Sequence, residues 1–165
     1  MGGEAGLRAD LASLAIPFAS HEHAAVFTVA ESRLAERDWP GESTKNLFLK
    51  DTAGAFWLIT VPAEMRVDLK ALPSAIGCKR VSFAKAEDME RLLGITPGSV
   101  TPLGMINAVP GSVTVVLDAG LAAAERINVH PLRNTATIGL AGPDVLRLLR
   151  RWGHEPVIAR IPAKD

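Results

Sequence analysis

The amino-acid sequence predicts an α+β fold, in which a mixed β-sheet is flanked by helices. Short apolar runs rich in β-branched residues suit strands, and segments with apolar residues at helical spacing suit helices. The two kinds of segment do not alternate as βαβ units would, which favours a mixed or antiparallel sheet. The chain has 165 residues, of which 48% are hydrophobic and 22% charged, a size and composition typical of one globular domain. We therefore expect residues 1–165 to form a single compact domain.

A β-hairpin is predicted between residues 46 and 61. The apolar runs 46–50 and 55–61 flank the sequence Asp-Thr-Ala-Gly, and a short turn of this composition between two such runs is typical of a hairpin. Runs of the same kind predict the remaining strands at 18–23, 80–84, 113–117, 127–130, 135–140 and 157–161.

Helices are predicted at 7–14, 28–37, 86–93 and 142–152. Leucines at helical spacing indicate the first, and Thr28 is a suitable cap for the second. Gly94 ends the third, and Pro143 suits the first turn of the fourth. His154 follows that last helix, where we expect it to place a favourable positive charge at the C-terminus.

The charge balance and the single cysteine restrict the class of protein. Eighteen basic and eighteen acidic residues give a formal net charge of zero, whereas proteins that coat nucleic acid are usually more basic. Any contact with RNA must therefore be local, and no DNA partner is expected. Cys78 has no second cysteine to pair with, which suits a reducing compartment. No apolar run approaches the ~20 residues that span a bilayer, and no signal core follows Met1. We expect a cytoplasmic protein without a membrane partner.

Three segments concentrate polar residues, glycine and proline where a core would not accept them: 44–46, 96–104 and 130–137. Lys45 leads into a strand and could direct its charge at a phosphate or carboxylate, although a lysine there can equally be a solvated surface residue. The second segment can present backbone N–H groups to a developing oxyanion or form an ordinary surface turn. His130 and its neighbours can serve catalysis or satisfy backbone groups of a turn.

Common catalytic motifs are missing from the sequence. There is no Gly-x-Ser-x-Gly elbow, His-Glu-x-x-His pair, P-loop or Gly-x-Gly-x-x-Gly segment. His21 and His23 would share one face of a strand but lack an evident third ligand, so no metal is expected. Ser99 has no identifiable base. A covalent mechanism is therefore unsupported, and no cofactor is expected.

Taken in order, these segments resemble the YbaK/prolyl-tRNA editing superfamily, which contains the insertion domain of bacterial prolyl-tRNA synthetases and its free-standing relatives. The resemblance extends from about residue 18 to residue 161. Lys45 followed by Asn46, together with His130-Pro131-Leu132, is most similar to the ProXp-ala branch, whose members deacylate alanyl-tRNA(Pro). The stretches that carry the resemblance are Thr-Lys-Asn-Leu-Phe-Leu-Lys-Asp (44–51), Gly-Ile-Thr-Pro-Gly-Ser-Val-Thr-Pro-Leu-Gly (94–104), His-Pro-Leu-Arg-Asn-Thr-Ala-Thr (130–137) and Gly-His-Glu-Pro (153–156).

The resemblance implies a compact α+β domain around a mixed, barrel-like sheet, and an enzyme that hydrolyses mischarged aminoacyl-tRNA. Lys45 would contact the phosphate or ribose of the terminal adenosine, while the 98–104 loop and the His130 segment would border the aminoacyl pocket. The implied partner is the acceptor end of tRNA(Pro) carrying alanine, with prolyl-tRNA synthetase or elongation factor as possible transient partners. Lys45, Lys50 and Arg133 could supply the local positive charge.

The aminoacyl ester is already labile, so the enzyme needs to place a water and stabilise an oxyanion rather than supply a strong nucleophile. The vicinal hydroxyl of the terminal ribose could orient or activate that water, while Asn46 and His130 would shape the pocket or hold the substrate amine. Proline would be excluded by pocket size, with Val29, Ile59, Val61 and Val129 as wall candidates. The expected catalytic residues are Lys45, Gly98, Ser99, Gly104 and His130. The expected substrate-binding residues are Thr44, Asn46, Val29, Ile59, Val129, Asn134 and Thr137.

Three alternatives remain open at this point. The same fold could remove cysteine or serine from tRNA, since pocket volume decides the substrate. A non-catalytic module could bind tRNA or a synthetase. An unrelated small-molecule esterase is disfavoured by the missing nucleophile elbow.

Overall fold

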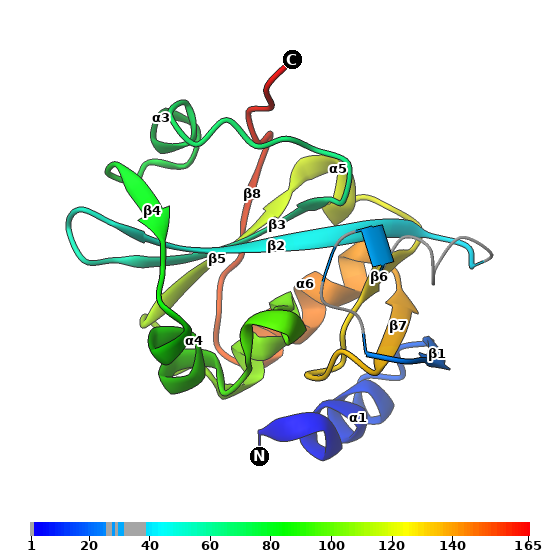
Figure 1. Cartoon of the computed structure of the whole chain (residues 1–165). Coiled ribbons are helices and arrows are strands. Elements are labelled where there is room, and N and C mark those ends of the chain that lie inside the picture. Colours follow the sequence, from blue (N-terminus) through cyan, green and yellow to red (C-terminus); the bar gives the residue numbers. More distant parts are fainter. Residues whose placement is uncertain (1, 26–27, 29, 32–38) are drawn as a thin grey trace.

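The computed structural model describes residues 2–25, 28, 30–31 and 39–165, and it has a mixed sheet with helices packed on it (Figure 1). The strands are β1 (Ala19–Glu22), β2 (Glu42–Asp51), β3 (Phe56–Pro62), β4 (Val81–Phe83), β5 (Val113–Asp118), β6 (Ile127–Val129), β7 (Ala136–Leu140) and β8 (Val157–Ala159). The helices are α1 (Gly3–Ser13), α3 (Leu72–Ile76), α4 (Ala86–Leu93), α5 (Ala119–Ala122) and α6 (Gly142–Arg151), with 3₁₀ turns η1 (Pro97–Ser99) and η2 (Pro102–Asn107). The predicted α+β class is confirmed.

Strand β2 is the centre of the sheet. The strand order is β1-β7-β6-β2-β3-β5-β8, and β4 also pairs with β2. Along one edge β2 pairs antiparallel with β3 from Thr44 to Lys50. Its other edge pairs in parallel with β6 at Glu42–Ser43 and antiparallel with β4 at Leu49–Asp51. The parallel pairs β3–β5 and β5–β8 complete the mixed sheet.

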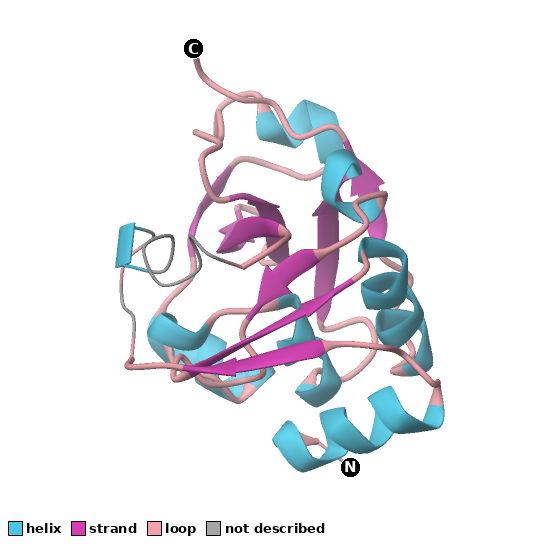
Figure 2. Ribbon diagram, turned by 90° about the vertical axis from the view of Figure 1, so that its right-hand side faces the viewer, coloured by secondary structure: helices cyan, strands magenta, loops and turns pink. Residues whose placement is uncertain are grey.

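Two apolar clusters cover the two faces of the sheet. The larger cluster joins α1, α4, η2 and α6 to one face, through side chains such as Leu7, Leu93 and Leu148 that are completely buried. We call this side the main-core face. The smaller cluster on the second face contains Ile59 and Leu72 of β3 and α3. Figure 1 shows α1, α4 and α6 below β2 and α3 above it. The termini lie at opposite ends in this view and in the view turned by 90° (Figure 2).

The predicted strands are all present, although β2 begins four residues before the predicted residue 46. Its first residues are polar, so no apolar pattern marks them, and pairing with β6 keeps them extended. Helix α4 has the predicted bounds and ends at Gly94 with φ of 65°. Only Thr28 and residues 30–31 of the predicted helix 28–37 lie within the described residues. There the Thr28 hydroxyl accepts a hydrogen bond from the Glu31 N–H at 3.1 Å, as a cap would.

The charge expected of His154 stays a prediction, but its side chain has a specific partner. Its side chain is buried, and Nε2 donates to the Met105 carbonyl at 2.8 Å. A carbonyl oxygen only accepts, so Nε2 must carry the proton. His154 thus connects the end of α6 to η2.

Asp51 closes the predicted hairpin with its side chain. Its Oδ1 accepts from the N–H groups of Ala53 and Ala55 at 3.0 and 2.9 Å, and its Oδ2 accepts from the indole of Trp57 at 3.2 Å. Burial alone would raise the pKa of the Asp51 carboxyl. The donors outweigh burial, first the Ala55 N–H and then Trp57, and lower the pKa below its ordinary value of 3.8.

Replacing Asp51 by Asn should destabilise the hairpin, since the amide cannot accept all of these bonds. We expect a loss of about 1–3 kcal/mol in the free energy of unfolding at pH 7, measured by denaturant titration. The carboxylate stabilises the fold above its unfolded pKa, and this contribution is lost as pH falls through the lowered folded pKa. The difference between wild type and variant should therefore shrink below pH 3.8. A difference that stays constant down to pH 2 would contradict this role.

Candidate aminoacyl-tRNA editing site

Lys45 and Asn46, two of the predicted site residues, lie at an opening in the edge of β2. Beyond Ser43 the pairing with β6 ends, and the pairing with β4 begins only at Leu49. Residues 45–47 therefore have no strand partner on this edge within the part of the chain that the structure describes. The last link to β6 is the Thr44 hydroxyl, which donates to the Asn128 carbonyl at 2.7 Å. Unpaired strand edges offer backbone donors and acceptors to a ligand.

Lys45 and Asn46 point to opposite faces of the sheet, because side chains alternate along a strand. Lys45 pairs with Val61, a residue of the second cluster, and so lies on the second face. Asn46 pairs with Thr60 on the main-core face. Asn128 of β6 pairs with Ser43, so it lies on the same face as Ser43 and Lys45. His130 follows Asn128 by two residues, just past the end of β6, and shares this face. Thr137 of β7 lies on that face as well, two residues from Gly139, the partner of Asn128.

The Lys45 ammonium is available for an anion. Burial, and secondly the positive charge of Arg66, lower the pKa of Lys45 below its ordinary value of 10.5. Among the residues that the structure describes, Lys45 has neither a hydrogen bond nor an ion pair. A half-buried cation beside a second cation, with no carboxylate bound to it, favours a phosphate ligand.

Asn46 attaches the glycine-rich segment to the sheet. Its Nδ2 donates to the Val100 carbonyl at 3.0 Å, and its Oδ1 accepts from the Thr60 hydroxyl at 2.6 Å. Thr60 is completely buried. Position 100 lies between η1 and η2, so this one amide fixes the loop relative to both β2 and β3.

The glycine-rich segment already uses two of the predicted backbone donors. The N–H of Ser99 donates to the Thr96 carbonyl at 2.9 Å, and the N–H of Gly104 donates to the Thr101 carbonyl at 3.1 Å. Ser99 is buried, and a Cβ on Gly104 would lie 3.1 Å from Ile95, so this glycine allows close packing. Gly98 lies within η1.

His130 and His23 form a histidine pair next to Thr137. The rings of His23 and His130 lie 6.4 Å apart between centroids. His130 Nδ1 donates to the Ala136 carbonyl at 3.0 Å, and His23 Nδ1 donates to the Ala24 carbonyl at 2.7 Å. The Thr137 hydroxyl lies 2.9 Å from His23 Nε2. Since the carbonyls fix the Nδ1 protons, Nε2 of a neutral His23 accepts from Thr137. Asn134 is half-buried in the turn that follows His130.

The wall candidates are distributed over both faces. Ile59 and Val61 are completely buried in the second cluster, whereas Val129 lies in the main core with 3% of its surface exposed. Val29 lies outside the described residues. Whether any of these residues limits the size of the aminoacyl group stays a prediction.

Comparison with known proteins decides the family. The model of the aminoacyl-tRNA editing domain matches residues 23–148, which include every segment of the site. The chain belongs to the aminoacyl-tRNA editing domain family. The superfamily predicted from the sequence is therefore confirmed, and so is the enzyme class of an aminoacyl-tRNA hydrolase.

Relatives of this editing domain cover nearly all of the chain. The prolyl-tRNA editing protein ProX of Acetoanaerobium sticklandii is 32% identical over 147 residues, 88% of this chain and 90% of ProX. Prolyl-tRNA synthetase associated domain-containing protein 1 of Bos taurus is 35% identical over 159 residues, 93% of this chain and 92% of the relative. A solved structure described as a candidate trans-editing enzyme for prolyl tRNA synthetase has the same fold, with a TM-score of 0.70, 20% identity and coverage of 97% and 98%.

One predicted contributor of charge in this editing domain is wrong. Arg133 was expected to supply free positive charge, but its guanidinium binds Glu4 at 2.7 Å and Glu22 at 2.6 Å. Hydrogen bonds to Glu22 and Glu4 raise the pKa of Arg133, and the Arg133 guanidinium lowers the pKa of both carboxyls. Arg133 thus connects α1 and β1 to the turn after His130. Lys50 lies near the far end of β2, 5.3 Å from the ring centroid of Phe56.

Two buried polar residues near the site were not predicted from the sequence. Thr60 lies on the main-core face beside Asn46, and Asn128 lies on the second face beside Ser43. Thr60 and Asn128 each stand between apolar neighbours in a strand, and such an interruption was the available signal. Asn128 Oδ1 and Arg126 Nε are buried without a hydrogen-bond partner among the residues that the structure describes. A Cβ at position 139 would lie less than 3 Å from both atoms. Glycine therefore leaves the space that the Arg126 side chain occupies.

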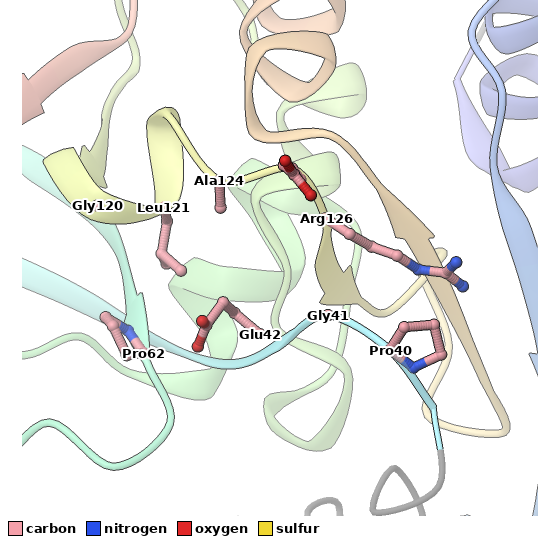
Figure 3. A pocket seen from close by; sticks show the side chains of 9 residues that line it. Pro40, Gly41, Glu42, Pro62, Gly120, Leu121, Ala124 and Arg126 are labelled. Atoms are coloured by element: carbon pink, nitrogen blue, oxygen red, sulfur yellow. The ribbon is translucent and has the colours of Figure 1, made fainter.

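A surface pocket of about 820 Å³ lies beside the start of β2 (Figure 3). Figure 3 shows Glu42 and Leu121 on its walls, while the guanidinium of Arg126 extends away past Pro40. The pocket contains none of the predicted site residues. Its lining residues are Pro40, Gly41, Glu42, Pro62, Gly120, Leu121, Ala124, Glu125 and Arg126.

Within the described residues, no helix is long and apolar enough to cross a membrane. The same residues contain no group of three or more His, Cys, Asp or Glu side chains placed to hold a metal ion.

Replacing Arg133 by Gln should release α1 and β1 from the turn after His130. We expect Tm at pH 7 to fall by several degrees, because two ion pairs are lost together. The carboxylates contribute above their ordinary pKa of 4.5, and this contribution is lost as pH falls through their lowered pKa values. The variant and wild type should therefore melt alike near pH 2.

Arg91 provides the matched control, since it forms one exposed ion pair with Asp88 at 2.9 Å. Arg91→Gln should change Tm by much less than Arg133→Gln. Equal effects of the two variants would contradict the connecting role of Arg133.

Proposed function

We propose that this editing domain acts in trans to hydrolyse the ester of alanyl-tRNA(Pro), and that it excludes proline by the size of its aminoacyl pocket. The observation that carries this proposal is an unpaired lysine at the open edge of β2, in a chain that matches the editing-domain model over residues 23–148. Relatives named for prolyl-tRNA editing and for association with prolyl-tRNA synthetase support tRNA(Pro) as the partner. Prolyl-tRNA synthetase or elongation factor would then be met only transiently.

Lys45 would bind the terminal nucleotide of the acceptor end through a phosphate oxygen or the ribose. Its half-buried position lets the ammonium attract an anion more strongly than a fully solvated lysine would. Arg66 adds to the same positive potential. A few local charges are sufficient to bind one end of the RNA, which agrees with a net charge of zero. The interaction should be weak and dependent on salt.

The reaction is hydrolysis of an ester. The oxygen of a water bonds to the carbonyl carbon of the alanyl group, and the bond from that carbon to the ribose oxygen breaks. The ribose oxygen takes up a proton, and alanine leaves with its carboxyl group. The neighbouring ribose hydroxyl can orient the water, so the protein contributes position and oxyanion stabilisation.

Selection against a small amino acid explains why a second pocket is useful. A missing methylene is worth only about 1–3 kcal/mol in a binding pocket, so a synthetase for proline cannot strongly reject alanine. A separate pocket that alanine enters and proline does not supplies the remaining discrimination. His130, Thr137 and Asn134 would border this pocket, and Val29, Ile59, Val61 and Val129 remain its wall candidates.

Deacylation assays on tRNA(Pro) charged with alanine, proline, cysteine or serine test the proposal directly. We expect rapid loss of alanine only, and a loss of at least about 100-fold in kcat/KM for Lys45→Ala, equivalent to nearly 3 kcal/mol. Turnover of the cysteinyl or seryl ester would move the proposal to that substrate. Absence of any turnover with tRNA still bound would instead support a non-catalytic binding module.

Binding of uncharged tRNA(Pro) should depend on the protonation of Lys45. The charged form exists below the pKa, so affinity should be complete at pH 7 and fall as pH rises through a value below 10.5. Lys45→Arg keeps its charge above pH 12 and should lose this decline. Lys45→Gln should reduce the slope of log affinity against log salt by about one. Equal pH profiles for wild type and Lys45→Arg would contradict the assigned contact.

A further inference from the structure

The Val100 carbonyl and the Thr60 hydroxyl together hold the amide of Asn46 in one orientation. A carbonyl oxygen can only accept, so the Asn46 atom 3.0 Å from the Val100 carbonyl must be Nδ2. The other end of the amide, 2.6 Å from the Thr60 hydroxyl, is therefore Oδ1. The orientation follows from chemistry alone and does not depend on distinguishing nitrogen from oxygen by other means.

The same hydrogen bonds decide what Asn46 has left for a ligand. An amide nitrogen carries two hydrogens, and the Val100 carbonyl takes one of them. The oxygen is engaged by a short bond from a hydroxyl that is completely buried. The amide thus retains an N–H donor, while its acceptor is committed to Thr60.

Two of the expected oxyanion donors in the loop are already engaged, so a donor outside the loop gains in value. The N–H groups of Ser99 and Gly104 already donate to Thr96 and Thr101 within the segment. Asn46 is half-buried on the stretch of β2 whose edge has no described strand partner. A ligand at this edge can reach groups on both faces of the strand, with Lys45 on one and Asn46 on the other.

We propose that Asn46 donates its remaining N–H to the carbonyl oxygen of the substrate ester, and that Thr60 is the positioning residue that keeps this N–H directed toward it. The proposal rests on the deacylase function proposed above. It assigns Asn46 to the oxyanion rather than to the substrate amine. A protonated amine needs an acceptor, and the Asn46 oxygen is already bound to Thr60.

Thr60→Val keeps the shape of the side chain and removes the hydroxyl. The amide is then held only by the Val100 carbonyl and its remaining N–H is less firmly directed. We therefore expect kcat for alanyl-tRNA(Pro) to fall by about 10-fold or more with KM nearly unchanged, since the weakened interaction belongs to the transition state. Thr60→Ser should restore most of kcat, because it restores the hydroxyl. Thr114→Val, a threonine of β5 beside Trp57, is the matched control for the change from threonine to valine and should leave kcat unaltered.

A substrate without the amine separates the two roles of Asn46. Propionyl-tRNA(Pro) carries the same ester but no amino group. Asn46→Ala should lower kcat by about 100-fold on both substrates, the loss typical of one missing oxyanion donor. If the loss disappears with the propionyl ester, Asn46 holds the amine and the proposal is overturned.

The outcomes also distinguish this proposal from the function on which it rests. Full activity of Thr60→Val, with its Tm equal to that of wild type, would overturn the role of Thr60 and leave the deacylase function standing. A wild-type protein that hydrolyses none of the esters would overturn both. A folded Thr60→Val variant with reduced kcat, rescued by Thr60→Ser, supports the proposal.

Discussion

The backbone of β2 must satisfy its hydrogen bonds on two edges, and most of the site follows from how it does so. One edge is paired almost throughout by β3. The other edge is shared by two short strands, β6 and β4, which come from distant parts of the chain and pair only with its ends. A strand of ten residues cannot be covered by partners of three residues each. The stretch between them has no strand partner among the described residues, and Lys45 and Asn46 lie on it.

The net charge is zero, but the basic residues differ in whether a carboxylate binds them. Arg133 is bound by Glu4 and Glu22, and Arg91 and Arg147 each face an acidic residue three positions away. The paired carboxylates offset the positive charge of these cations. Lys45 differs because burial and Arg66 act against its charge while no described carboxylate binds it. Position in the fold, more than net charge, determines which cation can bind a phosphate.

Much of the fold could be predicted from the sequence because apolar periodicity marks buried segments. The hairpin around Asp51 and helix α4 were predictable for this reason. The first residues of β2 were not, since Glu42 and its neighbours are polar and owe their extended form to β6. The alternation of side chains in a strand could also have placed Lys45 and Asn46 on opposite faces.

Family resemblance named Lys45, Asn46 and His130 as site residues, and their roles stay predictions. The structure places Lys45 and Asn46 on the open stretch of β2, but the contacts around them could not be predicted from the sequence. The partners of Arg133 lie 129 and 111 residues away along the chain, and no local pattern connects them. Thr60 stands in an apolar strand, and its sequence position does not reveal that its hydroxyl donates to the amide of Asn46. Such contacts are set by the fold as a whole.

The ion pair between Arg133 and Glu4 makes the turn after His130 depend on the first helix of the chain. Helix α1 packs into the main core through Leu7 and Leu11, and Glu4 in its first turn holds the guanidinium. The turn that follows His130 is therefore supported from the N-terminal helix. Proteolytic trimming of the first few residues would remove a support of the site without touching any residue in it.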